Sequence, residues 1–396
     1  MKLEERLKAQ MPQNELASAG MLCTYCDLGP CAINPFDDEP QVGACGIDAE
    51  NMNYLNLSLK VIKGLTDYGI AGNISLSLDT MLGYSHTAGV TIKDLVTASN
   101  PLLQASEQKV AEWQSEQRKP REIEHGIGVL EKDAVNIVIT VTSPEMMKTA
   151  RSQKMRNLAR DKDATGINLV GALCGGAETS YNYGIPLLGC THEVEEAADM
   201  IDFIYDGGDP TEACEKAVEN FSQRDKAAFR KFTPKRYTLG YDIKTDAIND
   251  AVKKGIVNGV VVIMGCKTGK NTWDMDGLVQ ELTDKKYMVI NLSCSLRGES
   301  EPEECEMMQE YNIPCVLNAG CCEPGKVKGL DLTTVTVVIP GWRDPRTLTA
   351  AFAFASEGVP VIVGTVPFVV PQVLNNLAAA GIKVESDSSK IADLVR

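Results

Sequence analysis

The sequence predicts an α/β protein with an N-terminal helical domain followed by two Rossmann-like domains built on parallel sheets. Two observations support this fold class. From Ala134 onwards, short β-branched runs that are apolar throughout alternate with helical stretches, as in parallel sheets covered on both faces. Before that point, apolar residues recur at helical spacing. We place the three domains at residues 1–130, 131–239 and 240–396.

The apolar runs after Ala134 are expected to be the strands of the two sheets. They are AVNIVIT, GINLVG, GVVVIMG, YMVINLS, PCVLNAG, VTVVIP and VPVIVGT. The helices between them are expected in MMKTARSQKMRNLARD, TDAINDAVKKG, DGLVQELTDK and LTAAFAFASEG. No strand is followed by G-x-G-x-x-G, and the segments GCKTGKN and GCCEPGKV both depart from the phosphate-loop pattern. We therefore expect no nucleotide.

The N-terminal third is predicted to be mainly helical. Residues 1 to about 18 are expected to form one short helix, and the pattern from Ile47 to about Leu130 is helical again. His86 and His125 fall in this region, and we interpret them as surface or capping histidines.

Composition excludes several classes of function. The chain has 396 residues, a formal net charge of −15, 13 cysteines and 3 histidines. The negative charge argues against nucleic acid and anionic membranes as partners. No secretory signal opens the chain and no apolar run is long enough to span a bilayer. We therefore expect a cytoplasmic protein whose cysteines bind metal rather than form disulfides.

Four cysteines near the N-terminus have the spacing C-x2-C-x4-C-x13-C. They are Cys23, Cys26, Cys31 and Cys45. Thiolates are soft ligands that suit zinc or an iron–sulfur cluster. A zinc knuckle usually splits its ligands into two tight pairs, whereas here a tight triplet precedes a distant fourth. This spacing favours a [4Fe–4S] cluster, with zinc as the alternative.

A second set of cysteines follows predicted strands. Its members are Cys174, Cys266, Cys294 and Cys322. In open parallel sheets ligands bind outside the carboxyl ends of the strands, so these thiols are expected to converge on a second cluster.

Other residues near these strands have weaker claims. Cys190, after GIPLLG, is a candidate replacement ligand, and Cys321 is expected to ligate or to line the site. Glu178 and Glu323, beside ligand cysteines, are candidate proton carriers. Cys214 shares a helical face with apolar residues and is expected in the core.

The pattern CxxCxxGPCxxxPF…xGxCGxDA resembles the cluster B segment of anaerobic nickel–iron carbon monoxide dehydrogenases, including non-ligand residues such as Pro30, Phe36 and Asp48. GINLVGALCGGAETSYNYGIPL and GWRDPRTLTAAFAFASEGVPVIVGTVP resemble further segments of that family. The resemblance implies a homodimer, a ferredoxin-like redox partner and an electron-relaying [4Fe–4S] cluster. It also implies that the strand-end cysteines occupy ligand positions of the catalytic cluster.

The same resemblance implies that several family residues are replaced. Thr142 stands at a histidine ligand, Tyr68 at the start of a histidine relay, and Arg346 at the catalytic lysine. Asn14 and Leu22 stand where the family has cysteines of a cluster shared across the dimer axis. One ligand cysteine is missing from MIDFIYDGGDP, and the helical domain is shortened. We therefore expect impaired CO chemistry and no bridging cluster.

Hybrid-cluster proteins, which are hydroxylamine-reductase relatives, have Trp-x-Glu-x-Lys where this chain has Trp342-Arg343-Asp344-Pro345-Arg346. This resemblance implies that Asp344 is an oxygen ligand of iron; the alternative is a helix-start residue before Pro345. We expect an iron–sulfur oxidoreductase that passes electrons to a divergent Fe–S or Fe–S–O cluster, with nickel left open, and reduces a small molecule such as hydroxylamine. The alternatives are a carbon monoxide dehydrogenase and a non-catalytic redox carrier, sensor or cluster-assembly module.

Overall fold

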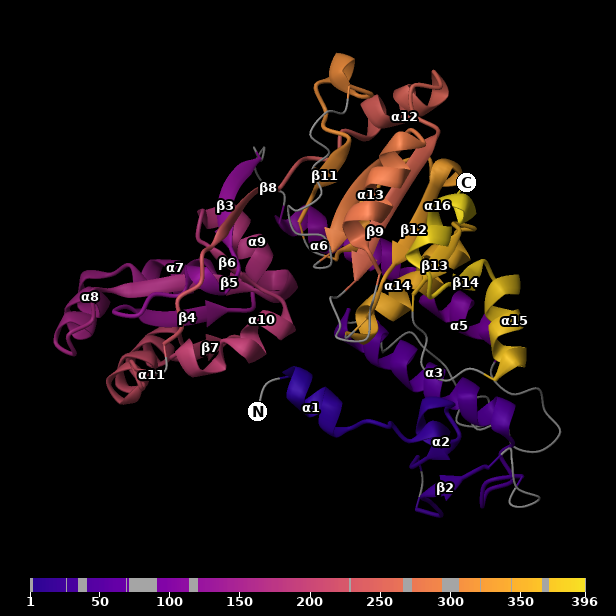
Figure 1. Ribbon diagram of the computed structural model, residues 1–396, viewed down its shortest axis with the longest axis horizontal. Coiled ribbons are helices and arrows are strands. Elements are labelled where there is room, and N and C mark those ends of the chain that lie inside the picture. The colour runs from indigo at the N-terminus through magenta and orange to yellow at the C-terminus, as the bar shows by residue number, and fades with distance from the viewer. Residues whose placement is uncertain are drawn as a thin grey trace.

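The protein has two lobes, each built around one six-stranded sheet (Figure 1). The structure is a computed structural model of the 396-residue chain. It describes residues 3–25, 27–34, 41–68, 70, 91–113, 120–227, 229–265, 273–293, 306–320, 322–342, 344–364 and 370–395, without the side chains of Lys109, Glu112, Trp113 and Cys174. The predicted α/β class is confirmed. Within these ranges no helix is long and apolar enough to cross a membrane.

The sheet of the first lobe has the order β7-β4-β5-β6-β3-β8. Its strands are β3 (Arg121–His125), β4 (Val135–Ile139), β5 (Ile167–Ala172), β6 (Leu187–Gly189), β7 (Phe203–Tyr205) and β8 (Lys235–Leu239). The strands pair in parallel except for the edge pair β3–β8, which is antiparallel.

Helices cover both faces of this first sheet. They are α7 (Pro144–Ala150), α8 (Gln153–Arg160), α9 (Leu173–Tyr183), α10 (Thr191–Glu196) and α11 (Pro210–Gln223), with 3-10 turns η2 (Ile127–Val129) and η3 (Ala198–Met200). One face of β4 packs through Ile137 and Ile139 against α7, α8 and α11. The opposite face packs through Val138 against η2 and η3, so the strand is apolar throughout because both faces are buried.

The sheet of the second lobe is parallel throughout and has the order β11-β10-β9-β12-β13-β14. Its strands are β9 (Gly259–Gly265), β10 (Tyr287–Ser293), β11 (Val316–Asn318), β12 (Val335–Ile339), β13 (Val361–Val363) and β14 (Ile382–Val384). The chain proceeds from β9 outward in one direction and from β12 outward in the other. The boundary between β9 and β12 is therefore the switch point of a doubly wound sheet.

Residues that alternate along β9 divide the second lobe into two cores. Val260 and Val262 face a large core, while Val261 and Ile263 face a smaller one. The helices of this lobe are α12 (Thr245–Lys253), α13 (Met275–Asp284), α14 (Pro345–Ser356), α15 (Pro371–Ala379) and α16 (Ile391–Leu394), with 3-10 turns η4 (Gln309–Tyr311), η5 (Pro324–Val327), η6 (Leu332–Thr334) and η7 (Ser388–Lys390). Helix α14 lies in the large core and α13 in the smaller one.

The N-terminal helices complete the large core of the second lobe. The N-terminal elements are α1 (Leu3–Ala9), α2 (Glu15–Ser18), β1 (Leu22–Cys23), β2 (Cys31–Ala32), α3 (Ala49–Asp67), α5 (Ile92–Ser99) and α6 (Pro101–Trp113). Helix α3 packs on α14 so closely that a Cβ at Gly64 would meet the Thr349 hydroxyl oxygen at 2.1 Å. In Figure 1, α3 runs beneath the second sheet, while α1 extends towards α10 of the first lobe.

Two helical predictions need correction. The single helix expected up to about Ser18 is two helices, α1 and α2, separated by Pro12, which lacks a backbone N–H and cannot continue a helix. The helical pattern expected to about Leu130 ends earlier, because residues 121–125 form β3 of the first sheet. His125 is therefore neither a surface nor a capping residue. It is buried, and its ring meets that of Tyr237 edge-on at 4.7 Å.

Candidate functional site

The N-terminal cysteine segment is held together by a short antiparallel pair and a glycine turn. Cys23 on β1 lies directly opposite Cys31 on β2. The backbone N–H of Ala44 donates to the Cys31 sulfur at 3.4 Å, which brings the neighbour of Cys45 against the same sulfur. Glycine at position 43 leaves room for the Ile47 side chain, because a Cβ there would lie 2.9 Å from the Ile47 Cγ2, and the Ile47 side chain would have to shift.

This segment fits a thiolate-bound cluster. Three of the four predicted ligands, Cys23, Cys31 and Cys45, belong to one small core with Ile33 and Ile47, and Cys26 lies outside the described residues. Amide donation to sulfur stabilises a thiolate. Asn14 and Leu22 have structural roles: the Asn14 side chain caps α2 by accepting from the Ala17 N–H at 2.8 Å, and Leu22 pairs with Ala32.

In the second lobe, Cys322 and the described residues that precede Cys266 and Cys294 meet at the carboxyl edge of the sheet. Ser293 and Gly265, the residues before Cys294 and Cys266, are direct partners in the β10–β9 register. The Gly265 N–H donates to the Cys322 sulfur at 3.2 Å. A Cβ at Gly265 would also come within 2.3 Å of the Gly341 carbonyl oxygen, so the loop after β12 lies at the same point. This point is the switch point of the sheet.

In the first lobe, helix α9 packs very closely against the carboxyl ends of the strands. Leu173, the first residue of α9, has φ +59°, a conformation uncommon outside glycine, and this turns the chain sharply between β5 and the helix. The next turn is glycine-rich: a Cβ at Gly175 would meet the Thr140 carbonyl oxygen at 2.6 Å, and one at Gly176 that of Ile139 at 2.1 Å. Cys174 is thus on a helix pressed against the carboxyl end of β4.

The ligand assignment itself stays a prediction. Cys266, Cys294, Cys305 and Cys321 lie outside the described residues, as does His86, and nothing is described of the Cys174 side chain. Among the described residues, no group of three or more His, Cys, Asp and Glu side chains forms a metal site.

Three other cysteines have defined surroundings. Cys190 begins α10: its backbone N–H and its thiol both contact the Glu193 carboxylate, at 3.0 and 3.2 Å. Cys214 lies in the core of the first lobe as predicted, and burial raises the pKa of its thiol to about 12. Cys315 is disulfide-bonded, so the expectation that cysteines form no disulfide is wrong at this residue.

Asp344 and Arg346 form an ion pair at the start of α14. One carboxylate oxygen of Asp344 accepts from the Arg346 backbone N–H at 2.9 Å, as a helix cap does. The other accepts from the Arg346 Nε at 2.7 Å. The guanidinium therefore orients the carboxylate, while the capping bond is the one expected of a helix-start residue. Thr142, at the predicted histidine position, lies 3.5 Å from the Gly175 carbonyl oxygen.

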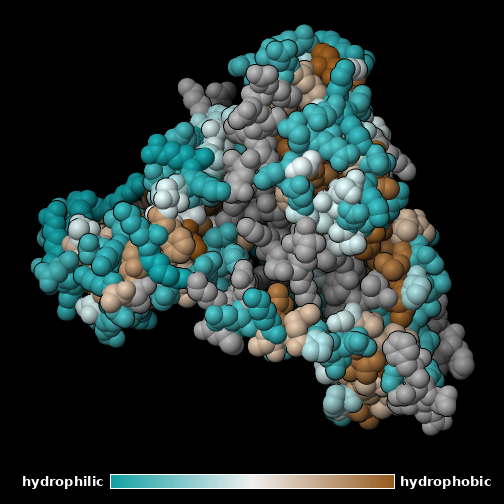
Figure 2. Space-filling model, in the orientation of Figure 1, coloured by the Kyte–Doolittle hydropathy of each residue, from teal (hydrophilic) through white to brown (hydrophobic). Residues whose placement is uncertain are grey.

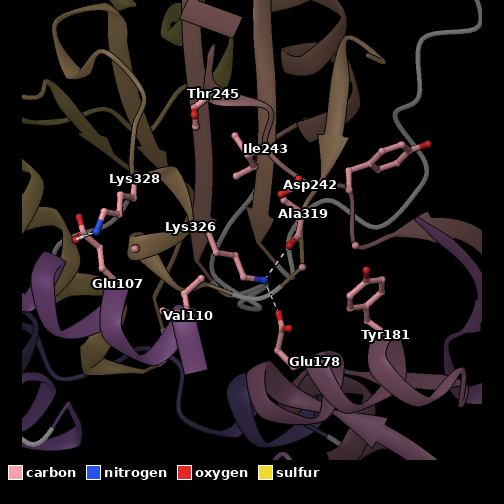
Figure 3. Close-up of a pocket in the computed structure, with 15 residues that line it drawn as sticks. Glu107, Val110, Glu178, Tyr181, Asp242, Ile243, Thr245, Ala319, Lys326 and Lys328 are labelled. Carbon is pink, nitrogen blue, oxygen red and sulfur yellow. Dashed lines mark hydrogen bonds and ion pairs between the residues drawn. The ribbon is translucent and has the colours of Figure 1, made fainter. Parts of the chain in front are cut away.

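A pocket of about 380 Å³ opens between the two lobes, beside these strand ends (Figure 3). Its lining includes Glu178 of α9, Lys326 of η5, and Ala319 and Gly320, which follow β11. Lys326 forms an ion pair with Glu178 and donates to the Ala319 carbonyl oxygen at 2.8 Å. The exposed fractions of these two charged side chains are only 7% and 1%.

The two predicted proton carriers differ in their surroundings. Glu178 lines the pocket, whereas Glu323 is buried and accepts from the Ser106 hydroxyl at 3.0 Å. From the sequence, Lys326 is not identified as a site residue, because GCCEPGKV is compared there only with the phosphate-loop pattern. A lysine four residues after a strand-end cysteine was the available signal.

The fold and the site together define a class of protein. It is an α/β protein with one set of cysteines in an N-terminal loop and a second set after the strands of its two sheets. The Prismane/CO dehydrogenase family matches residues 21–111 and 190–324, more than half of the chain. The chain therefore belongs to the Prismane/CO dehydrogenase family.

Known proteins show the same relationship. Carbon monoxide dehydrogenase 1 of Methanosarcina mazei is 21% identical over 580 aligned positions, covering 99% of this chain and 92% of the relative. Because the alignment is longer than the 396-residue chain, the relative contains long segments that this chain lacks. Carbon monoxide dehydrogenase 1 of Carboxydothermus hydrogenoformans is 35% identical over 91 residues, covering 23% of this chain and 14% of the relative.

Solved structures show the fold. Carbon monoxide dehydrogenase IV from Carboxydothermus hydrogenoformans superposes with a TM-score of 0.73 at 18% identity, covering 99% of this chain and 94% of the other. The nickel-free carbon monoxide dehydrogenase from Thermococcus sp. AM4 has the same TM-score and identity, covering 100% and 92%.

Proposed function

We propose that this protein is an iron–sulfur oxidoreductase with two cluster sites. Cys23, Cys26, Cys31 and Cys45 would hold a [4Fe–4S] cluster that relays electrons. Cys174, Cys266, Cys294 and Cys322 would hold the second cluster, which supplies the redox chemistry when bound. The observation that carries this proposal is the bond between the Gly265 N–H and the Cys322 sulfur, at the switch point of the second sheet.

The proposed substrate class is a small oxidised molecule, represented by hydroxylamine. The pairing of Arg346 with Asp344 argues against proton transfer by Arg346, as the family's catalytic lysine position would require, since a guanidinium that is always protonated and held by a carboxylate is a poor proton donor and acceptor. Thr142 is likewise a weaker metal ligand than histidine. In this proposal Asp344 contacts the second cluster directly or through water, and Arg346 orients it.

Oxidation of carbon monoxide is the second candidate, because the relatives named above are carbon monoxide dehydrogenases. It predicts nickel in the second site and rapid CO turnover with a viologen acceptor. A third outcome, a cluster that is fully coordinated and turns over neither compound, would indicate a redox carrier, sensor or cluster-assembly module.

The test uses anaerobically purified full-length protein. About eight iron atoms per chain are expected from two four-iron clusters. With reduced viologen as donor, hydroxylamine consumption should exceed CO oxidation measured in the same preparation after nickel reconstitution. CO turnover at ordinary enzyme rates, with no hydroxylamine consumption, would contradict the proposed substrate class.

Two cysteine variants locate the activity. Cys322→Ala should lose the second-cluster signal and turnover while retaining the N-terminal cluster. Cys214→Ala is the matched control, because Cys214 is a buried cysteine in the core of the first lobe and should keep both clusters. Full hydroxylamine turnover in Cys322→Ala would remove the second site from the mechanism.

We also propose a homodimer without a bridging cluster, served by a ferredoxin-like partner. Leu28 and Val42, in the N-terminal cysteine segment, are 59% and 49% exposed, which supports a covered surface there. Hydrophobic residues gather around this segment in Figure 2, whereas the first lobe is mostly hydrophilic. Light scattering with iron analysis tests this: a dimer with iron beyond that of four clusters would contradict it.

A further inference from the structure

The pocket between the lobes leads from solvent to a buried ion pair. Three of its walls belong to different parts of the chain: α6 contributes Glu107, α9 contributes Glu178 and Tyr181, and η5 contributes Lys326 (Figure 3). Gly240, in the connection between the lobes, presses against Tyr181, since a Cβ there would lie 2.0 Å from the ring. The pocket is therefore a feature of the lobes' contact and of neither lobe alone.

The ion pair in this pocket is deeply buried. Glu178 and Lys326 are almost inaccessible, yet both line the pocket. Burial alone favours the neutral form of a carboxyl group, whereas an adjacent ammonium favours the carboxylate. Burial and the Lys326 ammonium therefore act on the Glu178 carboxyl group in opposite directions.

The pair lies beside the strand ends that carry the proposed ligands of the second cluster. Lys326 is anchored to Ala319, and it follows Cys322 by four residues, while Glu178 follows Cys174 by four. Glu323 is closer to Cys322 in sequence, but Ser106 holds it and it does not line the pocket. Of these two carboxylates, Glu178 is the one that lines the pocket, and it also lies against Gly320, which follows β11.

Other charged and titratable groups also line the pocket. They are Glu107, Lys328, Tyr181, Tyr241 and Asp242. Glu107 and Lys328 pair with each other at 3.0 Å, and both are more exposed than the buried pair. Figure 3 shows that pair on the opposite side of Lys326 from Tyr181.

We propose, on the basis of the reductase function above, that this pocket is the proton inlet of the second cluster and that Glu178 is the proton carrier, with Lys326 as its charge partner. An electron delivered to these strand ends adds negative charge, which favours the neutral carboxyl. Glu178 then takes a proton from pocket water and gives it to the reduced substrate. For hydroxylamine the balance is two electrons and two protons, giving ammonia and water.

The test measures proton uptake in the absence of substrate. The proton-inlet proposal can therefore fail while the proposed reductase activity is observed, and it can hold while that activity is absent. Anaerobic, iron-loaded protein is reduced photochemically in weakly buffered solution with a pH-indicator dye. The wild type should take up a proton with the electron that reduces the second cluster. Glu178→Gln should lose this uptake, because it has no carboxylate, while keeping its iron and the N-terminal cluster signal.

Variants of the charge partner separate proton transfer from structure. Lys326→Met should also lose the uptake, because the buried Glu178 is then neutral before reduction, and Lys326→Arg should restore it. Lys154→Met is the control: it breaks an exposed lysine–glutamate pair of the first lobe, Lys154–Glu215 at 2.9 Å, and should leave uptake unchanged.

Wild-type uptake in Glu178→Gln would overturn the proposal. If that variant fails to load iron, the two Lys326 variants decide, and equal uptake in Lys326→Met and Lys326→Arg would overturn it.

Discussion

The substitution Gly176→Ala sets two physical effects of opposite sign against each other. Gly176 lies inside α9, where alanine has the higher helix propensity, so propensity alone predicts stabilisation by about 0.5–1 kcal/mol. Packing predicts the reverse, because the new Cβ would lie 2.1 Å from the Ile139 carbonyl oxygen and 3.1 Å from the Gly171 carbonyl carbon.

The packing effect should win. Ordinary contacts begin at 3.4 Å, and the obstacles are backbone atoms of β4 and β5, which cannot rotate away as a side chain can. Helix α9 must therefore retreat from the sheet by roughly 1 Å, and overpacking of this kind typically costs about 1–3 kcal/mol. After the gain in propensity, we expect a net loss of about 1–2 kcal/mol, or roughly tenfold in the unfolding equilibrium.

Urea unfolding followed by circular dichroism measures this loss, and iron analysis measures its effect on the site, because α9 carries Cys174 and Glu178. We expect Gly176→Ala to unfold at lower urea and to hold less iron. Gly166→Ala is the matched control in the same lobe, since no atom lies within 4 Å of its Cβ. A Gly176→Ala protein as stable as the wild type, with full iron, would refute the packing argument.

Three further predictions concern single side chains. Burial raises the pKa of Asp202 to about 6 from 3.8, against the attraction of Arg224. Between those pH values the folded protein retains a proton that the unfolded chain has lost, so the free energy of unfolding should fall as pH rises. Asp202→Asn should remove this slope in urea unfolding compared with the wild type. Asp344→Asn keeps a capping side chain but removes the charge, so it should alter the second-cluster spectrum and hydroxylamine turnover; an unchanged spectrum would leave Asp344 as a helix-start residue. Cys45→Ala should abolish the N-terminal [4Fe–4S] signal and ferredoxin-driven turnover, and an intact signal would remove Cys45 from the ligand set.

Apart from the short, partly exposed strands β7 and β14, the sequence predicted the parallel strands well, because burial on both faces leaves a continuous apolar run. β9, for example, is buried at every residue. The antiparallel pair β3–β8 at one side of the first sheet has no such run, because each strand buries only its third and fifth residues. They were therefore missed, and their polar sequences gave no sign that they pair with each other.

The sequence could predict only those parts of the candidate site whose position follows from nearby residues. Strand-end cysteines could be recognised because the carboxyl ends of parallel strands always share one edge. The contact between Glu178 and Lys326 joins residues 148 positions apart on different lobes, and no periodicity or spacing encodes it. Likewise, Asn291 donates to the Asn318 side chain at 2.8 Å across two strands, which only the register of the sheet reveals.

The packing of α3 on α14 has a consequence for synthesis. The second lobe is a discontinuous domain: its core draws on residues before β3 and on residues after β8, with the first lobe inserted between them. During translation, the apolar faces of α3 and α5 leave the ribosome long before their partner α14 exists. The first lobe can fold during that interval, since domains generally fold as units as they emerge. A nascent chain stalled before Pro345 should therefore bind a chaperone through its earliest helices.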